Sequence, residues 1–287
     1  MHFGHVLTAM VTPFTQDNQV DFPTMTKLIE YLLDNGTEGL VVTGTTGESP
    51  TLSPVEMEEI YKRVVAVVNK RVPVLAGTGS NDTNSSVQLT KKATELGVDG
   101  IMLVAPYYNR PNQIGIFEHF KTIAAETDLP IMLYNIPSRC GVHIEAQTIV
   151  QLSEISNIVA VKEASGNLDQ VSEIITSTKE NFSVYSGDDS LTLPILSVGG
   201  SGIVSVASHI IGNELNQMVK TFFSGNVRKS AEIHQNILPI MKGLFMAPSP
   251  APTKAALKFK GLDVGSVRLP LVDLSPEEQL VLKELIM

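Results

Sequence analysis

The sequence predicts a closed (β/α)8 barrel, an α/β fold, followed by a C-terminal helical extension. Short apolar segments rich in β-branched residues alternate with longer amphipathic segments, a pattern typical of parallel strands joined by right-handed helical crossovers. Eight such apolar segments precede Gly225, where the strand pattern stops. Eight parallel strands suffice to close a barrel of this type. We therefore expect a (β/α)8 barrel over residues 1–225 and a helical region over residues 226–287.

A doubly wound open sheet is the alternative arrangement of the same segments. Such a sheet often binds a dinucleotide through a Gly-x-Gly-x-x-Gly motif after its first strand, and the sequence has no such motif there. The predicted strands are residues 6–11, 39–43, 72–76, 101–105, 131–135, 158–162, 182–186 and 202–206.

The helical segments carry start and stop signals. The segment Ser53-Pro54-Val55-Glu56 supplies an N-cap, a first-turn proline and a capping-box acid, and it opens a helix that ends near residue 69. Similar signals bound helices at residues 23–33 and 81–96. Beyond the barrel, helices are predicted at residues 226–244, 252–260 and 276–286.

The composition restricts the possible partners and compartments. The formal net charge of −9 over 287 residues argues against a nucleic acid as the main partner. The longest apolar stretch, residues 195–211, is broken by Gly and Ser, so no membrane span is expected. The N-terminus shows no signal-peptide pattern, and the single cysteine, Cys140, fits the cytoplasm. The six histidines form no cluster, and we expect neither a metal nor a cofactor.

Lys162 is the central candidate for chemistry, because it stands at the end of the apolar strand 158–162. Burial of an ammonium is costly, and desolvation lowers the lysine pKa and frees a neutral amine. A neutral amine in a dry pocket can attack a ketone and form a Schiff base. The alternative is a structural ion pair with Glu163 or another acid.

Polar residues follow several other strands, at the end of the barrel where active sites of this fold lie. Tyr134 ends the strand 131–135, and its phenol is a candidate for proton transfer. The other strand-end candidates are Thr45, Thr46, Tyr107, Tyr108, Arg139 and Gly187. Hydroxyls and an arginine can hold carboxylates. A buried amine, a phenol, hydroxyls and an arginine together suit carbanion chemistry on an α-keto acid.

Three segments carry a resemblance to a known family: residues 44–48 (Gly-Thr-Thr-Gly-Glu), residues 134–139 (Tyr-Asn-Ile-Pro-Ser-Arg) and residues 161–164 (Val-Lys-Glu-Ala). The chain resembles the pyruvate-dependent class I aldolases of the N-acetylneuraminate lyase superfamily. Within it, the chain is most similar to the dihydrodipicolinate synthase family, which condenses pyruvate with L-aspartate 4-semialdehyde in lysine and diaminopimelate biosynthesis.

The resemblance implies roles for individual residues. Lys162 would form the Schiff base with pyruvate, and Tyr134 would donate and accept protons. Thr45 and Tyr108 would complete the proton relay. One relay tyrosine comes from the neighbouring subunit in this family, which implies a homodimer or homotetramer with Tyr107 at the interface.

The resemblance also implies the binding residues. Thr46 and the backbone around Val204 would hold pyruvate, and the backbone of Gly187 would approach the substrate. Arg139 would receive the carboxylate of the semialdehyde. Sialic-acid lyases of the superfamily generally lack this arginine, so Arg139 favours the synthases.

Members of the family that lysine inhibits carry two histidines and a glutamate at positions that correspond here to Pro54, Met57 and Ser85. Asn81 and Tyr107 match the inhibited members. Because the charged amine of lysine needs polar acceptors, weak or absent inhibition is expected. Two other functions stay open from sequence alone: a lyase of a longer sugar acid within the superfamily, and a ligand-binding barrel that has lost catalysis.

Overall fold

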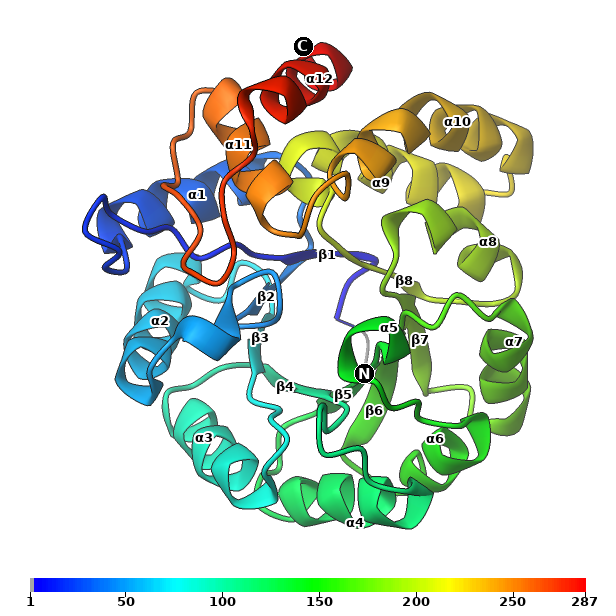
Figure 1. The fold of residues 1–287 in the computed structure, drawn as a ribbon. Coiled ribbons are helices and arrows are strands. Elements are labelled where there is room, and N and C mark those ends of the chain that lie inside the picture. The colour runs from blue at the N-terminus through cyan, green and yellow to red at the C-terminus, as the bar shows by residue number, and fades with distance from the viewer. Residues whose placement is uncertain (1–2) are drawn as a thin grey trace.

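Eight parallel strands form a closed barrel in the computed structural model, which describes residues 3–287. Each strand pairs with the next, and the last pairs with the first, so the order around the barrel is the order in the chain (Figure 1). The strands are β1 (Val6–Ala9), β2 (Gly39–Val42), β3 (Val74–Gly77), β4 (Gly100–Val104), β5 (Ile131–Asn135), β6 (Ile158–Glu163), β7 (Ser183–Ser186) and β8 (Gly202–Ser205).

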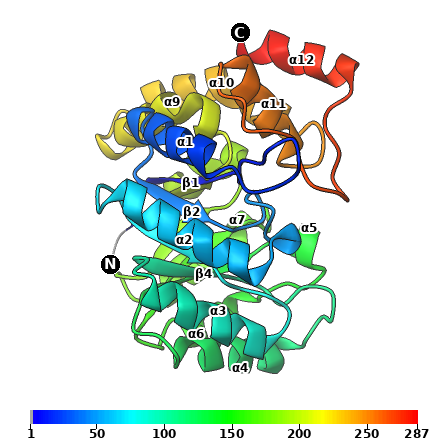
Figure 2. The same cartoon turned by 90° about the vertical axis from the view of Figure 1, so that its left-hand side faces the viewer.

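Helices surround this barrel as an outer ring (Figure 1). The helices up to residue 223 are α1 (Phe22–Asp34), α2 (Pro54–Val68), α3 (Thr83–Glu95), α4 (Gln113–Ala124), α5 (Pro137–Cys140), α6 (Ala146–Leu152), α7 (Leu168–Ser177), α8 (Thr192–Ser197) and α9 (Ser208–Phe223), and all of them except α5 belong to the ring. Two 3-10 turns, η1 (Ser49–Thr51) and η2 (Asp189–Leu191), follow β2 and β7. The short helix α5 lies over one end of the barrel in both Figure 1 and Figure 2.

The barrel class and the predicted strands are confirmed, and the strand bounds agree with the prediction to within two residues at each end. The capping box of α2 is confirmed too, since the Ser53 side chain accepts from the Glu56 amide and the Glu56 side chain accepts from the Ser53 amide. The sequence patterns did not indicate α5 or α8, which have four and six residues. Helices this short contain too few turns for a clear period.

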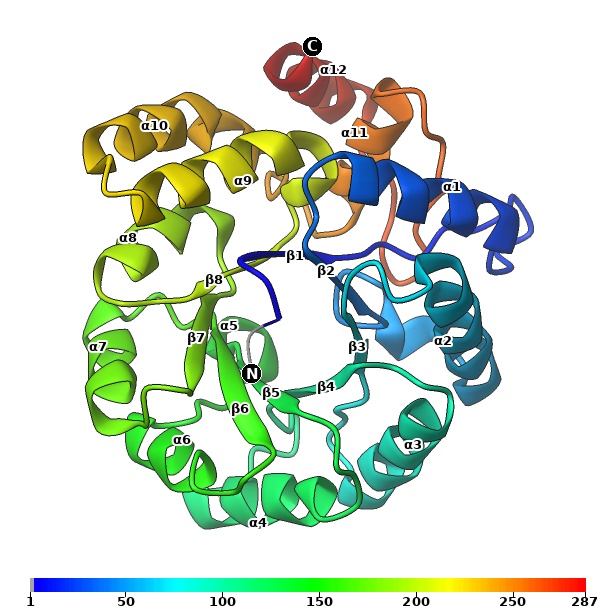
Figure 3. The same ribbon diagram turned by 180° about the vertical axis from the view of Figure 1, so that it is seen from behind.

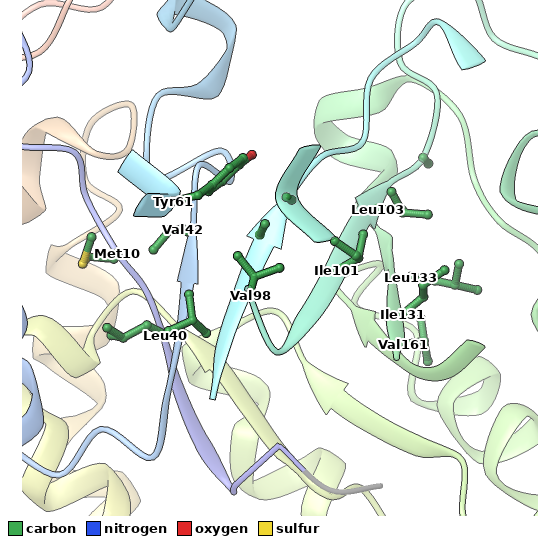
Figure 4. Packing of buried hydrophobic residues seen from close by; sticks show 14 of the residues in the cluster. Met10, Leu40, Val42, Tyr61, Val98, Ile101, Leu103, Ile131, Leu133 and Val161 are labelled. Carbon is green, nitrogen blue, oxygen red and sulfur yellow. The ribbon is translucent and has the colours of Figure 1, made fainter. Parts of the chain in front are cut away.

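Residues along each strand alternate between two apolar layers, as the side-chain period of a strand requires. One set faces the helices, among them Leu40, Val42, Ile101, Leu103 and Val161 (Figure 4). The other set fills the barrel interior and consists of Phe3, Leu7, Ala9, Val41, Leu75, Met102, Met132, Tyr134, Ala160, Tyr185 and Val204. This alternation decides which strand-end side chains can reach an interior site.

Three further helices follow the ring: α10 (Val227–Gly243), α11 (Ala251–Phe259) and α12 (Pro276–Ile286). They pack beside α9 and α1 on one side of the barrel (Figure 2). Their apolar side chains share a cluster with Val6 of β1 and Ile203 of β8. These helices match the three predicted ones to within one residue at each end, while the division at residue 225 into two domains stays a prediction.

The segment that leads into β1 crosses the opposite end of the barrel from α5 (Figures 2 and 3). The glycine-rich segment 199–202 lies near this end, and close packing explains its composition. A Cβ on Gly202 would meet the His5 carbonyl oxygen, and a Cβ on Gly200 would meet Ile195. The predicted absence of a signal peptide concerns residues that include Met1 and His2, which lie outside the described part of the chain. No helix within residues 3–287 is long and apolar enough to cross a membrane.

Candidate active site

Lys162 and Tyr134 are neighbours across the β5–β6 pair, where their Cα atoms are in register. Both side chains point into the barrel, because they share the strand face of Ala160 and Met132, which belong to the interior cluster. The Nζ of Lys162 lies 4.1 Å from the centroid of the Tyr134 ring. The fold therefore places an amine and a phenol together at the end of the barrel interior.

Burial controls the protonation of Lys162. Only 5% of the residue is exposed, and desolvation lowers its pKa to about 7 from an ordinary 10.5, although the charge of Asp189 opposes the shift. Glu163 lies on the opposite strand face: its carboxylate accepts from Asn135 Nδ2 at 2.9 Å, Gln170 Nε2 at 3.0 Å and the Ser165 amide at 2.7 Å. The Glu163 carboxylate therefore has its hydrogen-bond partners outside the barrel interior, and it forms no ion pair with Lys162.

Asp189 is a buried carboxylate that sequence reasoning did not distinguish from its exposed neighbour Asp188. It accepts from the Ser205 hydroxyl and from the amides of Val206 and Ala207, both at 3.1 Å. Burial raises its pKa, and its hydrogen bonds oppose that shift. The sequence placed both aspartates after the strand but carried no signal for which one turns inward.

Tyr134 is buried, and burial raises its pKa; the charge of Arg139 and a hydrogen bond with Thr45 act in the opposite direction. Thr45 comes from the loop after β2 and is half-buried, while the adjacent Thr46 is buried. The loop starts at Thr43, which has a φ of 51° and whose hydroxyl lies 2.9 Å from the Tyr61 hydroxyl and 3.0 Å from the Gly77 carbonyl oxygen. These contacts fix the start of the loop at residues 43–48, which we call the threonine loop.

Two of the predicted binding residues, Arg139 and Gly187, line one cavity, whereas Thr46 and Val204 are not part of its lining. Its lining includes Arg139, Ser138, Ala164 and Gly187. Arg139 is exposed on the short helix α5. A Cβ on Gly187 would lie 3.1 Å from both Cγ and Cε of Lys162 and 2.7 Å from the Ala164 Cβ. The absence of a side chain at this position therefore leaves room for the lysine.

Tyr108 is the one predicted catalytic residue that the described chain leaves largely exposed: it is 87% exposed, with a φ of 74°. Tyr107 is half-buried and lines a separate cavity with Ser49, Pro54, Met57 and Ser85.

Val204 lies in β8 beside Leu7 of β1, with its side chain in the barrel interior. Within residues 3–287 no group of three His, Cys, Asp or Glu side chains is arranged to hold a metal ion.

Comparison with known proteins identifies the family of this chain. Residues 2–287 match the dihydrodipicolinate synthetase family. The chain belongs to this family. Its sequence is 58% identical over 287 residues to the 4-hydroxy-tetrahydrodipicolinate synthase of Bacillus subtilis, covering 100% of this chain and 99% of that protein. The family resemblance and the expectation of a lyase of this family are therefore confirmed.

Solved structures of the family have the same fold. The crystal structure of a dihydrodipicolinate synthase from Bacillus anthracis superposes with a TM-score of 0.98 at 56% identity and covers 100% of this chain and 98% of that chain. The synthase of Cyanidioschyzon merolae, solved with lysine bound, gives a TM-score of 0.97 at 45% identity, covering 99% of this chain and 98% of that chain. The barrel and the C-terminal helices are thus common to the family.

Proposed function

We propose that this chain condenses pyruvate with L-aspartate 4-semialdehyde to 4-hydroxy-tetrahydrodipicolinate, in the biosynthesis of lysine and diaminopimelate. Relatives such as the Bacillus subtilis protein carry that name at 58% identity. The observation that carries the proposal is the buried Lys162, whose pKa of about 7 supplies a neutral amine beside the phenol of Tyr134. This is the arrangement that Schiff-base catalysis requires.

The reaction balances without a cofactor. The Lys162 amine attacks the ketone carbon of pyruvate, and water leaves as the Schiff base forms. Loss of a proton from the methyl carbon gives an enamine, which attacks the aldehyde carbon of the semialdehyde, and the aldehyde oxygen takes up a proton. The amino group of the joined product then displaces Lys162 from the former ketone carbon, which closes the ring and frees the enzyme.

In this scheme Tyr134 transfers the protons, and Thr45 and Tyr108 connect it to solvent. Support comes from the burial of Tyr134 and from the Thr45 side chain, which lowers the pKa of the Tyr134 phenol. General acid–base help of this kind is worth roughly 10²–10⁴-fold in rate. Thr46 and the backbone around Val204 hold the pyruvate carboxylate.

The second substrate occupies the cavity beside Lys162. Arg139 binds the carboxylate of the semialdehyde, since a guanidinium offers a planar pair of donors to a carboxylate. The backbone of Gly187 borders the same cavity. The position of Arg139 in this lining supports a short dicarboxylic product over a long sugar acid.

The working enzyme is a homodimer or a homotetramer in this proposal. Tyr108 is largely exposed in the single chain, so we place its hydroxyl in the proton relay of a neighbouring subunit, with Tyr107 at the shared interface. We also place the reaction in the cytoplasm, which fits the free thiol of Cys140.

Substrate choice is tested by one panel of assays. Condensation is measured with pyruvate and L-aspartate 4-semialdehyde, and cleavage is measured with sialic acid and a keto-deoxy sugar acid. Fast condensation without detectable cleavage is expected. The variant Arg139→Gln should raise the KM for the semialdehyde by about tenfold or more, while the exposed Arg228→Gln serves as control. Fast sugar-acid cleavage without condensation would refute the proposal.

A further inference from the structure

A buried ion pair joins the threonine loop to the C-terminal helices. The Nζ of Lys254 in α11 lies 2.7 Å from Oε1 of Glu48, and the two side chains are only 2% and 1% exposed. Desolvating two charges costs free energy, and a fold is often at least as stable when apolar residues of similar volume replace a buried ion pair. Stability alone is therefore a weak reason for placing charges here.

Glu48 is tied closely to the loop that carries Thr45 and Thr46. Its amide donates to the Thr45 carbonyl oxygen at 3.0 Å. Its own backbone is left-handed, with a φ of 58°, a conformation that a residue with a side chain adopts only when its surroundings enforce it. The Thr12 hydroxyl donates to the carbonyl oxygen of the intervening Gly47 at 2.7 Å. A shift of the Glu48 side chain would thus move the backbone at Thr45.

The other side of the pair is equally fixed. Lys254 Nζ also donates to the Ser266 carbonyl oxygen at 2.9 Å and lies 4.2 Å from the centroid of the Phe14 ring. The Arg268 amide donates to Oε2 of Glu48 at 2.8 Å. Thus α11 and the segment that follows it hold both oxygens of the Glu48 carboxylate.

Arg268 extends this attachment to the next helix. Its guanidinium forms an ion pair with Glu56 in the first turn of α2 and donates to the Thr51 carbonyl oxygen at 2.8 Å. The threonine loop and the start of α2 are consequently held by residues that lie more than 200 positions away in the sequence.

We propose that Lys254 is a positioning residue for the condensation: through Glu48 it fixes the loop that presents Thr45 to Tyr134. The inference rests on the proposed function, because it requires Thr45 to act in the proton relay. The C-terminal helices then contribute to turnover through this ion pair, in addition to any contribution to stability. Lys254 itself touches no substrate.

The test compares Lys254→Met with Lys258→Met, a control on the same helix whose ion pair with Asp263 is 65% and 58% exposed. Lys254→Met is expected to lower kcat by about tenfold, because small misplacements of catalytic groups carry costs of that order. Lys162 is untouched, so the yield of the borohydride-trapped pyruvate adduct at saturating pyruvate should not change. Lys258→Met should keep the wild-type kcat.

A double-mutant cycle with Thr45→Val separates positioning from stability. If Lys254 acts through Thr45, its effect on kcat disappears in the Thr45→Val background. An effect that multiplies with that of Thr45→Val, or a wild-type kcat for Lys254→Met, overturns the inference and leaves the proposed function intact. If Thr45→Val alone has a wild-type kcat, Thr45 does not act in the proton relay, and the inference about Lys254 is also wrong.

Lys254→Met leaves the Glu48 carboxylate without its cation and so risks misfolding. The double variant Glu48→Gln/Lys254→Met removes both charges and keeps an acceptor for the Arg268 amide. It is expected to show the same loss of kcat, measured per folded protein. A wild-type kcat in this variant also overturns the inference.

Discussion

Lys162 Nζ lies 4.1 Å from the centroid of the Tyr134 ring, and the two residues are partners in adjacent strands. The relationship depends on strand geometry, since residues opposite one another on one sheet face are nearest neighbours. The rest of the site is arranged around this pair: Asp189 and Arg139 act on the charge of Lys162, and the Thr45 side chain lowers the pKa of Tyr134, against the effect of burial.

The depressed pKa of Lys162 predicts the pH dependence of Schiff-base formation. Only the neutral amine attacks pyruvate, so the initial trapping rate should rise as pH increases through about 7 and then level off. A solvated lysine would keep gaining neutral amine up to its ordinary pKa of 10.5. The measurement is the rate of adduct formation against pH by intact mass. A rate still rising steeply above pH 9 would contradict the burial effect.

Gly187→Ala should slow trapping by crowding Lys162. The added methyl would lie 3.1 Å from the lysine Cε and 2.7 Å from the Ala164 Cβ, so one of the three groups must move. We expect the adduct to form about tenfold more slowly. Gly115→Ala in α4 is the control, because its methyl would meet only Pro111 and Asn112. Equal trapping rates in the two variants would show that the added methyl does not hinder the Lys162 side chain.

Tyr108→Phe should retain pyruvate trapping and lose turnover, because the lysine is intact and the relay is broken. General acid–base help predicts a loss of roughly 10²–10⁴-fold. Mixing Tyr108→Phe with Lys162→Ala under conditions that exchange subunits should restore about a quarter of wild-type activity, since each mixed dimer holds one complete site. No recovery on verified subunit exchange would show that Tyr108 does not serve a neighbouring subunit.

Free L-lysine should inhibit weakly or not at all. The cavity lined by Pro54, Met57, Ser85 and Tyr107 also contains Glu58, but that carboxylate lies 3.9 Å from the ammonium of Lys92. Glu58 is the one carboxylate in this lining, and its pairing with Lys92 leaves a second ammonium without a free anionic partner there. Initial condensation rates are measured over a range of lysine concentrations. Strong inhibition at sub-millimolar lysine would refute this prediction.

The sequence predicted the barrel because its strands and helices carry strong periodic patterns, and it placed Lys162 and Tyr134 at strand ends. It also predicted burial of the Tyr134 ring and of the Lys162 amine, while the shared inward face of both side chains follows from the fold, in which Ala160 and Met132 belong to the interior cluster. What it could not supply was the individual side-chain contacts between distant segments. The choice of Asp189 over Asp188 depends on the Ser205 hydroxyl and on the amides of Val206 and Ala207, which precede α9.

The Glu48–Lys254 pair illustrates the same limit. Glu48 follows the threonine pair in sequence and reads as a turn residue, and Lys254 lies in an ordinary amphipathic helix. Nothing in either local pattern indicates burial of a charge, because the pairing results from the docking of α11 against the loop after β2. Likewise, the exposure of Tyr108 becomes visible only when the single chain is folded.

The most direct test of the account is intact mass after incubation with pyruvate and borohydride, for the wild type and for Lys162→Ala. We expect one reduced pyruvate adduct on the wild type, mapped to Lys162 and diminished when L-aspartate 4-semialdehyde competes, and no adduct on the variant. The absence of an adduct on folded wild-type protein, or an equal adduct on Lys162→Ala, would contradict Schiff-base catalysis at this site.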